Sequence, residues 1–350
     1  MTKKLSQLRL FDFFSGCGGT SIGFAQAGMD IAFALDFDAD ASATFKLNLP
    51  RAQLIGLDIR NVDAEVLRPL MRTRATPVLF CGCAPCQPFS KQNRQARTHD
   101  PRRSLLMNFG RFVSRWKPEY IFVENVPGLQ NVDDDDGPLS EFTALLEKLG
   151  YLYSIDVVSA LSYGVPQTRK RLILLASFEP GLEIPRGAYG PEALPASTVR
   201  DWIGWLPPIE AGETSDVDPD HRAAQLSKLN LARIKATPEG GGRENWPKRL
   251  WLDCHRGYVG HSDVYGRLAW DRPAAGLTTR CISYSNGRFG HPDQNRAISV
   301  REAPCLQTFP TNYRFSGSLE SKGRQIGNAV PPLMAKAIGE AVMKHAQKYT

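Results

Sequence analysis

The 350-residue sequence lacks any apolar run of the roughly 20 residues that a membrane-spanning helix requires. Its first residues also lack the short apolar core of a secretory signal. The seven cysteines are an odd number and show no spacing typical of a disulfide framework. These absences argue against membrane and secreted proteins. They predict a protein of the reducing cytoplasm, associated with the nucleoid if the source is a bacterium.

The cysteines also lack the pairing that a structural zinc site requires. Cys81, Cys83 and Cys86 are close together, but zinc needs a second group of ligands at similar spacing. The remaining cysteines are scattered: Cys17, Cys254, Cys281 and Cys305. The four adjacent carboxylates of Asp133 to Asp136 are interpreted as a solvated loop. We therefore expect no metal site.

Positive charge is concentrated in one part of the chain. The net charge is +7, and residues 221–300 alone hold thirteen Lys and Arg against six Asp and Glu, which is 13 − 6 = +7. A basic segment of this kind favours an anionic polymer as partner. The alternative is a solvated basic face with no partner.

The first half of the chain alternates between apolar runs and amphipathic segments. This alternation predicts an α/β fold with a parallel sheet covered by helices on both faces. The expected helices are Thr20 to Ala27, Ser104 to Trp116 and Pro138 to Leu149. The expected strands are Leu8 to Phe14, Ile31 to Leu35, Val78 to Gly82, Tyr120 to Glu124, Tyr151 to Val158 and Arg171 to Ala176.

The pattern changes after about Phe178. The following residues are rich in Pro, Gly, Trp and Arg, which predicts a smaller domain of short strands and loops. A last helical stretch, Pro331 to His345, is expected to return to the first domain. The predicted domains are residues 1–178 with 325–350, and residues 179–324.

One cysteine stands in an unusual setting. Cys86 follows Pro85 in an irregular loop that the buried strand ending at Gly82 delivers, and Pro88 prevents regular structure after it. Free cysteine has a pKa near 8.5, so a nucleophilic thiol needs a nearby group that favours the thiolate. The alternative is a small buried hydrophobe, which is the commoner role of a lone cysteine.

A glycine-rich turn follows the first strand and leads into a helix. Phe14, Gly16, Gly18 and Gly19 stand where a ligand can approach the backbone and the free N–H groups of a helix start. Asp36 ends the second strand, where an acid commonly binds ribose hydroxyls, and Asp58 ends the next short apolar run. The glycine spacing differs from that of dinucleotide-binding proteins. A ligand with one ribose and no pyrophosphate fits at least as well.

Three further motifs complete a set: Glu124-Asn125-Val126, Gln167-Thr168-Arg169-Lys170-Arg171 and Gly327-Asn328-Ala329-Val330-Pro331-Pro332. With the cysteine loop and the glycine turn, in this order, the chain strongly resembles the cytosine-C5 DNA methyltransferases. The resemblance covers nearly the whole chain except the middle of the second domain. It implies a Rossmann-like methyltransferase sheet that uses S-adenosylmethionine, together with a strand-and-loop target-recognition domain.

The resemblance implies a role for each matching residue. Cys86 matches the nucleophile, Glu124 the acid that binds cytosine, and Arg169 and Arg171 the arginine pair near the target base. Arg169 is expected to hold the base carbonyl. The expected cofactor contacts are Phe14, Gly16, Gly18 and Gly19 around S-adenosylmethionine, Asp36 on its ribose, Phe37 on its adenine, Asp58 and Ile59 at the adenine edge, and Asn328 and Val330 from the C-terminal side.

These residue types suit the chemistry. Thiolate addition at C6 of cytosine makes C5 nucleophilic enough to accept a methyl group. A protonated Glu124 at N3 would offset the charge that builds on the ring. Loss of the C5 proton then expels Cys86. Because a stacked base is out of reach, the cytosine must be flipped out of the duplex.

The basic segment would then read double-stranded DNA. Arg243, Arg249, Arg256 and Arg280 are candidates for base or phosphate contacts. The aromatic residues of the segment, expected mostly in the core, are Trp246, Trp251, Tyr258, Tyr265 and Trp270. Residues 300–310 resemble a family segment that organises this domain, with Cys305 in the core. We expect a monomer with a restriction–modification or orphan modification role; the cognate endonuclease is not inferable from the chain. The alternatives are a tRNA cytosine-C5 methyltransferase and an inactive DNA-binding relative.

Overall fold

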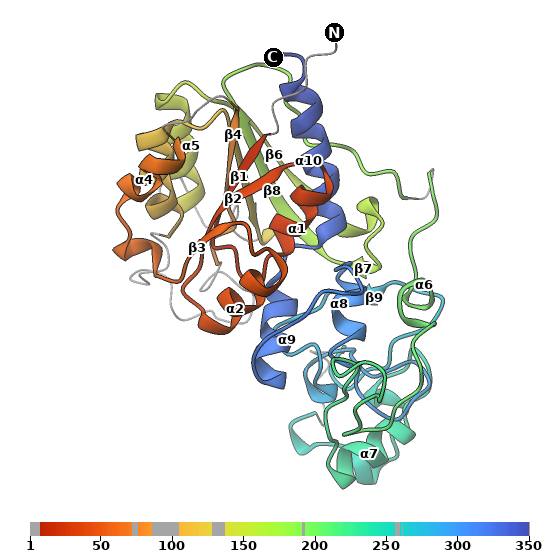
Figure 1. Cartoon of the computed structure of the whole chain (residues 1–350). Helices are drawn as coiled ribbons and strands as arrows, with labels where there is room; N and C mark the ends of the chain where they lie inside the picture. The colour runs from red at the N-terminus through yellow and green to blue at the C-terminus, as the bar shows by residue number, and fades with distance from the viewer. Residues whose placement is uncertain are drawn as a thin grey trace. The chain divides into compact units, whose positions relative to one another are not determined.

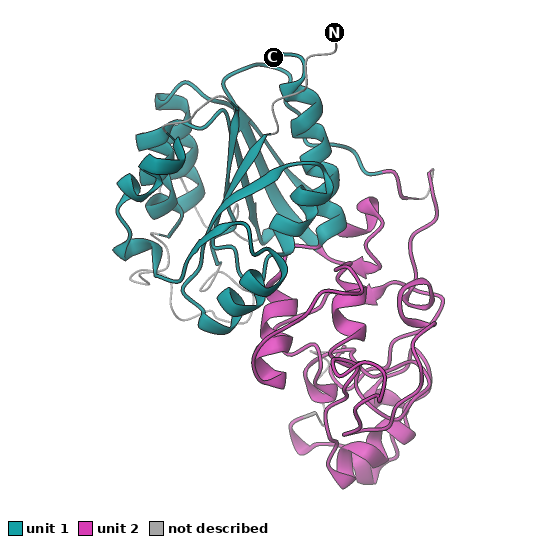
Figure 2. Ribbon diagram, in the orientation of Figure 1, with its two compact units in different colours: residues 1–159, 170–187, 332–350 teal, residues 160–169, 188–331 magenta. Residues whose placement is uncertain are grey.

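The computed structural model describes residues 8–71, 76–85, 105–127, 137–190, 193–255, 260 and 262–349. Contacts within the chain define two compact units, residues 1–159, 170–187 and 332–350, and residues 160–169 and 188–331 (Figure 2). The second unit therefore includes residues 160–169, with the first three residues of the Gln167 to Arg171 motif, and residues 325–331, beyond the limits predicted from the sequence. Among the described residues, no helix combines the length and apolarity needed to cross a membrane.

The first unit is built on a seven-stranded sheet in the order β3-β2-β1-β4-β5-β8-β6 (Figure 1). The five strands from β3 to β5 run parallel, and β8 is antiparallel to both β5 and β6. The strands are β1 (Arg9–Phe13), β2 (Asp30–Leu35), β3 (Gln53–Ile55), β4 (Val78–Gly82), β5 (Tyr120–Asn125), β6 (Leu152–Ser159) and β8 (Lys170–Ser177).

Apolar residues on β1 and β4 explain why the centre of this sheet is buried. The Phe13 ring lies 5.2 Å from the ring of Phe80 on β4, centroid to centroid. On the helix that covers this face, Phe109 and Phe112 lie 5.2 and 4.8 Å from Phe13. Strands that are buried on both faces need such continuous apolar runs, and tilted aromatic pairs add to the packing energy.

Helices cover both faces of the sheet, as the sequence predicts. Helices α4 (Leu105–Trp116) and α5 (Pro138–Lys148) lie on one face, and α1 (Gly19–Gln26) and α10 (Pro332–Ala346) lie on the other (Figure 1). Gly23 lets α1 and α10 approach closely, because a Cβ there would stand 2.4 Å from the carbonyl oxygen of Pro332. The α10 helix thus joins the first unit, in line with the predicted return of the chain.

The predicted parallel sheet is confirmed for most of its strands, whereas β8 runs antiparallel to its neighbours β5 and β6. A buried run such as β8 has the same apolar pattern whichever way it points. Two elements were also missed, α2 (Ala39–Asn48) and β3. The side chain of Asp38 caps α2 by accepting from the N–H groups of Asp40 and Ala41, which is a helix-start signal that the sequence carries.

The second unit has little regular structure. Its helices of five residues or more are α6 (Val199–Ile203), α7 (Lys228–Lys235), α8 (Glu302–Leu306) and α9 (Leu319–Asn328). Its strands β7 (Gln167–Thr168) and β9 (Ala274–Ala275) form one short parallel pair. Loops make up most of the rest.

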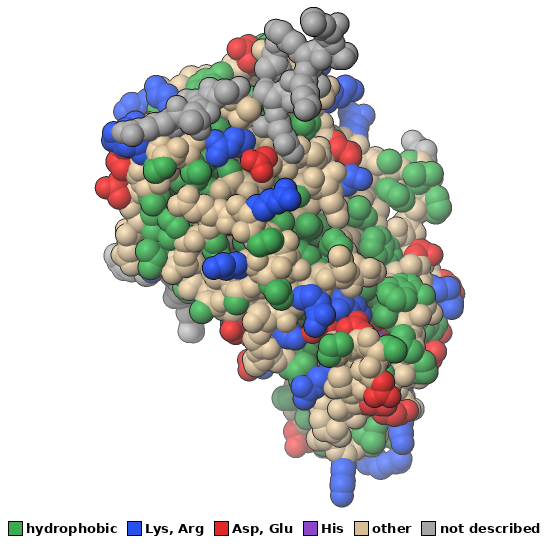
Figure 3. All heavy atoms as spheres, in the orientation of Figure 1, with side chains coloured by type: hydrophobic (Ala, Val, Ile, Leu, Met, Phe, Trp, Pro, Cys, Tyr) green, Lys and Arg blue, Asp and Glu red, His purple; other side chains and the backbone are tan. Residues whose placement is uncertain are grey.

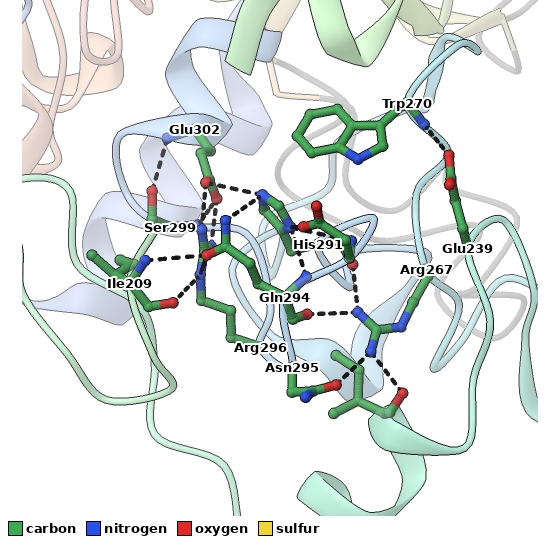
Figure 4. A network of polar contacts seen from close by, with 12 residues as sticks. Ile209, Glu239, Arg267, Trp270, His291, Gln294, Asn295, Arg296, Ser299 and Glu302 are labelled. Atoms are coloured by element: carbon green, nitrogen blue, oxygen red, sulfur yellow. Dashed lines mark hydrogen bonds and ion pairs between the residues drawn. The ribbon is translucent and has the colours of Figure 1, made fainter. Parts of the chain in front are cut away.

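Buried arginines connect these loops (Figure 4). The Arg267 guanidinium donates to the carbonyl oxygens of Thr237, Ile234, His291 and Gln294. Arg296, which is 0% exposed, makes a two-pronged ion pair of 2.6 and 2.7 Å with Glu302. Side chains here satisfy backbone groups that sheet or helix would otherwise pair.

The aromatic residues also help to form this core. The Arg233 guanidinium lies over the rings of Trp246 and Tyr265, at 5.1 and 5.3 Å from the ring centroids. Trp246 is 5% exposed, and the Tyr265 ring also packs edge-on against Tyr284. The aromatic residues named here therefore belong to the core.

The buried pair of Arg296 and Glu302 gives a testable prediction for stability. Burial alone would raise the pKa of Glu302, but the hydrogen bonds and charge of Arg296, together with His291 and the Ser299 N–H, outweigh burial and hold that pKa below its ordinary value. The substitution Glu302→Gln leaves the Arg296 charge buried and uncompensated, so we expect a loss of about 3 kcal/mol in the free energy of unfolding. Urea denaturation measures it.

The matched control is Asp271→Asn, which breaks an exposed pair with Arg200. Water and salt screen an exposed pair, so this variant should stay close to the parent protein in its free energy of unfolding. Equal losses in the two variants would contradict a special role for the buried pair.

Candidate active site

The turn after β1 has the backbone conformation that its glycines suggested. Gly16 and Gly18 have φ values of +52° and +90°, in the left-handed region that favours glycine. Phe14 also has a positive φ, +62°, which is uncommon for a bulky residue. A Cβ added at Gly16 would have no atom within 4 Å, so the space beside this turn is open. Strained backbone of this kind is typical of ligand-binding segments.

Asp36 is tied to this turn. Its carboxylate accepts hydrogen bonds from the N–H groups of Gly16 and Asp38, each at 2.8 Å. Burial raises the pKa of Asp36 above its ordinary value. Beside it, the Phe37 ring is 68% exposed, although large apolar side chains are usually covered. A held carboxylate next to an exposed ring fits a ligand with one ribose and a flat base.

Asp58 and Ile59 follow a short loop after β3. The Asp58 carboxylate pairs with the Arg60 guanidinium at 2.6 Å, and the hydrogen bond from Arg60 lowers the pKa of Asp58. Ile59 is 3% exposed and packs in the core of the first unit. Its carbonyl oxygen accepts a hydrogen bond of 2.9 Å from Arg111, so the Ile59 backbone is covered as well as its side chain.

A buried acid, Asp12, lies in β1 just before the turn, and no role is predicted for it from the sequence. Asp12 is 0% exposed in β1 and accepts a hydrogen bond of 2.6 Å from the Ser21 hydroxyl in α1. Burial raises the pKa of Asp12 from 3.8 to about 7. The signal was present in the sequence, since a carboxylate inside an apolar strand must find a partner.

Asp12 gives a testable prediction for pH dependence. Its folded pKa of about 7 lies above its ordinary 3.8, so between these values the folded protein binds a proton that the unfolded chain has released. The resulting stability is present below about pH 4 and is lost as the pH rises through 7, about 4 kcal/mol in all. Urea unfolding of Asp12→Asn should lack this pH dependence. A variant with the same slope as the parent protein between pH 5 and pH 8 would contradict the assignment.

The loop that leads to Cys86 begins at the end of β4, where every strand residue is buried. The Asn125 side chain donates a hydrogen bond of 3.2 Å to the carbonyl oxygen of Ala84. Gly82 packs against Phe109, whose ring would lie 2.6 Å from an added Cβ. The start of the loop is therefore anchored from two sides. Cys86 itself lies outside the described residues.

Glu124 and Arg171 are brought together by neighbouring strands. Glu124 lies near the end of β5, and Arg171 lies near the start of the antiparallel β8. The Arg171 Nε lies 2.6 Å from the Glu124 Oε1. The two side chains are 10% and 17% exposed, so water screens this ion pair only partly. A positively charged guanidinium and a carboxylate thus stand side by side near the end of β5, whose last residue, Asn125, anchors the start of the cysteine loop.

Arg169 has different contacts. It is 5% exposed, and its Nη1 donates to the carbonyl oxygens of Leu277 at 2.8 Å and Gly327 at 3.0 Å. All three residues belong to the second unit. These contacts favour a structural role for Arg169. Of the two arginines, Arg171 is the one that pairs with Glu124.

The last two predicted cofactor residues also belong to the second unit. Asn328 is the final residue of α9 and is exposed, whereas Val330 is 4% exposed. Asn328 is therefore accessible to a ligand, whereas Val330 is largely buried.

The candidate recognition arginines differ in exposure. Arg243 is 9% exposed and donates to the carbonyl oxygen of Gly260, whereas Arg249 is exposed. The Arg280 side chain is 63% exposed and lies 3.9 Å from Glu320. Figure 3 shows exposed Lys and Arg side chains on the second unit, in blue at the bottom of the view. Arg256 and Tyr258 lie outside the described residues.

In the part of the chain that the structure describes, no group of three or more His, Cys, Asp or Glu residues is placed to hold a metal ion. The acidic tract of Asp133 to Asp136 is not among the described residues.

Known proteins resemble the chain along its whole length. The family model for C-5 cytosine-specific DNA methylase matches residues 8–344. Type II methylase M.HgiDII of Herpetosiphon aurantiacus is 38% identical over 96% of this chain and 95% of its own length. Type II methyltransferase M1.HphI of Haemophilus parahaemolyticus is 33% identical over 96% of this chain and 87% of its own.

Solved structures agree. A protein described as a DNA modification methyltransferase of an Escherichia coli prophage superposes with a TM-score of 0.77 at 25% identity, covering 98% of this chain and 100% of its own. The Entamoeba histolytica methyltransferase EhMeth has a TM-score of 0.67 at 16% identity, with 97% and 99% covered. At that lower identity the likeness shows the fold.

Proposed function

The chain belongs to the C-5 cytosine-specific DNA methylase family, and we propose that Glu124 and Arg171 hold the target cytosine for attack by Cys86. The chain is a DNA (cytosine-5-)-methyltransferase that uses S-adenosylmethionine. The observation that carries the residue assignment is the ion pair of 2.6 Å between Arg171 and Glu124. It places a hydrogen-bond donor for the base carbonyl beside a carboxyl group for N3.

The two arginines of the motif then have separate roles. Arg171 takes the base carbonyl, in place of Arg169, since the Nη1 of Arg169 is committed to two backbone carbonyls. The Arg171 guanidinium also offsets negative charge as the thiolate adds to the ring. Arg169 supports the segment around Gly327.

The reaction at the cytosine follows from these assignments. The Cys86 thiolate forms a bond to C6, and the electron pair of the C5–C6 bond becomes available at C5. Glu124 carries the proton that N3 needs as charge builds on the ring. After methyl transfer, C5 loses its proton to a base through water and the C6–sulfur bond breaks, which releases Cys86 as thiolate.

The residues of the first unit suit the cofactor. The open turn of Phe14, Gly16, Gly18 and Gly19 leaves room for the methionine part of the molecule. Asp36 is held where it can accept from ribose hydroxyls, and the exposed Phe37 ring can stack on adenine. We assign the adenine edge to Asp58 and Ile59, and a further contact to Asn328 and Val330. Bound S-adenosylmethionine supplies the methyl group as an electrophile.

Duplex DNA is the proposed polymer. Exposed cations such as Arg249 in the loop-rich second unit suit phosphate and base contacts. The Type II methylases among the relatives support a restriction–modification role, with an orphan modification role as the alternative. We propose that the enzyme acts as a monomer without a metal and flips the target cytosine out of the duplex.

The first test of this function uses Cys86→Ser. Purified protein with labelled S-adenosylmethionine should transfer label to unmethylated DNA, at cytosines that share one short sequence in bisulfite sequencing. The serine variant should bind DNA and transfer no label, because a hydroxyl is far less ionised than a thiol. Normal turnover by the variant would remove Cys86 from the mechanism.

Bulk tRNA in a separate tube is the control for the polymer. Label in tRNA alone would contradict the DNA assignment. DNA binding by the parent protein without any label would indicate an inactive relative.

The acid gives a second test. The substitution Glu124→Gln keeps the size of the side chain but cannot transfer a proton to N3. We expect kcat to fall about 10²-fold or more, with little change in S-adenosylmethionine affinity. Single-turnover methylation at saturating cofactor measures the rate, and an unchanged rate would contradict the role of Glu124.

A further inference from the structure

The segment around Asn328 is held by two buried side chains. The Arg169 Nη1 donates to the carbonyl oxygen of Gly327 at 3.0 Å, immediately before Asn328. The Gln307 Nε2 donates to the carbonyl oxygen of Ala329 at 2.5 Å, immediately after it. Gln307 is 0% exposed and Arg169 is 5% exposed, whereas Asn328 between their partners is exposed. Hydrogen bonds from buried side chains thus hold the backbone on each side of Asn328, while Asn328 itself is exposed.

The backbone at Gly327 has no freedom to shift toward its neighbour. A Cβ added there would lie 2.0 Å from the carbonyl oxygen of Thr278, so only glycine fits this close packing. Helix α9 ends at Asn328, and Pro331 stops the chain from continuing as a helix. Asn328 is therefore at a fixed helix end, on a segment packed against residues 278–279.

A chain of buried amides fixes the orientation of Gln307. The N–H of Leu277 donates to the Gln167 Oε1 at 3.0 Å, so the Gln167 Nε2 must face the other way. That Nε2 donates to the Gln307 Oε1 at 2.6 Å, which turns the Gln307 Nε2 toward the Ala329 carbonyl. The chain begins at a backbone group that can only donate and ends at one that can only accept. Its direction is therefore determined, with no free choice of amide orientation.

Burying two polar amides costs free energy, which is justified only if the exact position of the segment around Asn328 matters. Burying the amides of Gln167 and Gln307 costs desolvation, and hydrogen bonds do little more than recover that cost. Apolar side chains of similar size would fill the same space. What the amides add is direction, because each one constrains its neighbour along a fixed line of donors and acceptors.

We propose that Gln307, together with Arg169, is a positioning residue for S-adenosylmethionine binding, and that it acts by holding Asn328. This inference rests on the proposed role of Asn328 as a cofactor contact. Gln307 touches neither cofactor nor DNA in this proposal. Its effect reaches the cofactor through the Ala329 carbonyl and the position of the Asn328 side chain.

The test compares two buried glutamines of the second unit. Gln307→Met removes the hydrogen bond to Ala329 while keeping the bulk. The matched control is Gln325→Met, one helical turn before Asn328 in α9, because Gln325 is 4% exposed and donates to the carbonyl oxygen of Ser316 and the hydroxyl of Ser321. The full-length protein is measured for S-adenosylmethionine affinity, for kcat at saturating cofactor, for DNA affinity and for unfolding temperature.

We expect Gln307→Met to weaken S-adenosylmethionine binding about fivefold, the loss of one hydrogen bond, with kcat and DNA affinity nearly unchanged. Gln325→Met should leave cofactor affinity unchanged. Equal effects of the two variants on cofactor affinity, or none from Gln307→Met, would overturn the inference. Gln307→Glu serves if the methionine variant does not fold, because it keeps the acceptor for Gln167 and places an oxygen against the Ala329 carbonyl.

Asn328→Ala separates this inference from the proposed function. In that background Gln307→Met should weaken cofactor binding no further, since the two residues act on one contact. Additive effects would mean that Gln307 acts by another route, which overturns the inference alone. Unchanged affinity in Asn328→Ala would instead remove the proposed cofactor role of Asn328, whatever Gln307 does.

Discussion

The ion pair of Arg171 and Glu124 depends on the direction of one strand. Glu124 lies near the carboxyl end of β5, and β8 begins at Lys170. Because β8 is antiparallel to β5, its first residues lie beside the last residues of β5, and Asn125 pairs with Leu172. A parallel β8 would place Arg171 at the opposite edge of the sheet. The antiparallel strand therefore creates the site where the target base is proposed to bind.

The other candidate site residues of the first unit lie at the carboxyl edge of the parallel strands. The turn of Phe14 and Gly16 ends β1, Asp36 follows β2, and the loop toward Cys86 follows β4. Adjacent parallel strands bring these ends together, as in other doubly wound sheets. Hydrogen bonds then lock the positions, from the Gly16 N–H to Asp36 and from Asn125 to Ala84. The energy that fixes these groups is supplied on folding, so binding need not order them.

Much of the first unit could be predicted from the sequence, and the limits have physical causes. Apolar periodicity located β1, β4 and β5 within two residues of their ends, because buried strands leave little choice of side chain. Strand direction has no such signature, so the antiparallel direction of β8 could not be predicted. The motif also could not separate Arg169 from Arg171, since both are arginines two residues apart and only their partners differ.

The positive charge of residues 221–300 shows the same limit in the second unit. The sequence counts thirteen cations there, but Arg233, Arg243, Arg267 and Arg296 are buried. These guanidiniums are used inside the unit. Arg267 satisfies carbonyls of several loops, and Arg296 is neutralised by Glu302. A count of charges cannot distinguish these arginines from the exposed Arg249.

This use of arginine explains how a unit with so little sheet or helix can hold a defined shape. A guanidinium offers five donors in a rigid plane, so one side chain can satisfy carbonyls from several loops at once. Isolated backbone pairs, such as Arg267 with Gly290 and Gly290 with Ala297, join the same loops, so exposed loop side chains are not needed to hold the loops together. Sequence recognition requires such freedom, because the residues that face the bases must differ between enzymes with different targets. In this chain the internal arginines carry the structure of the second unit, and the exposed loop residues are left for the contact with DNA that we propose.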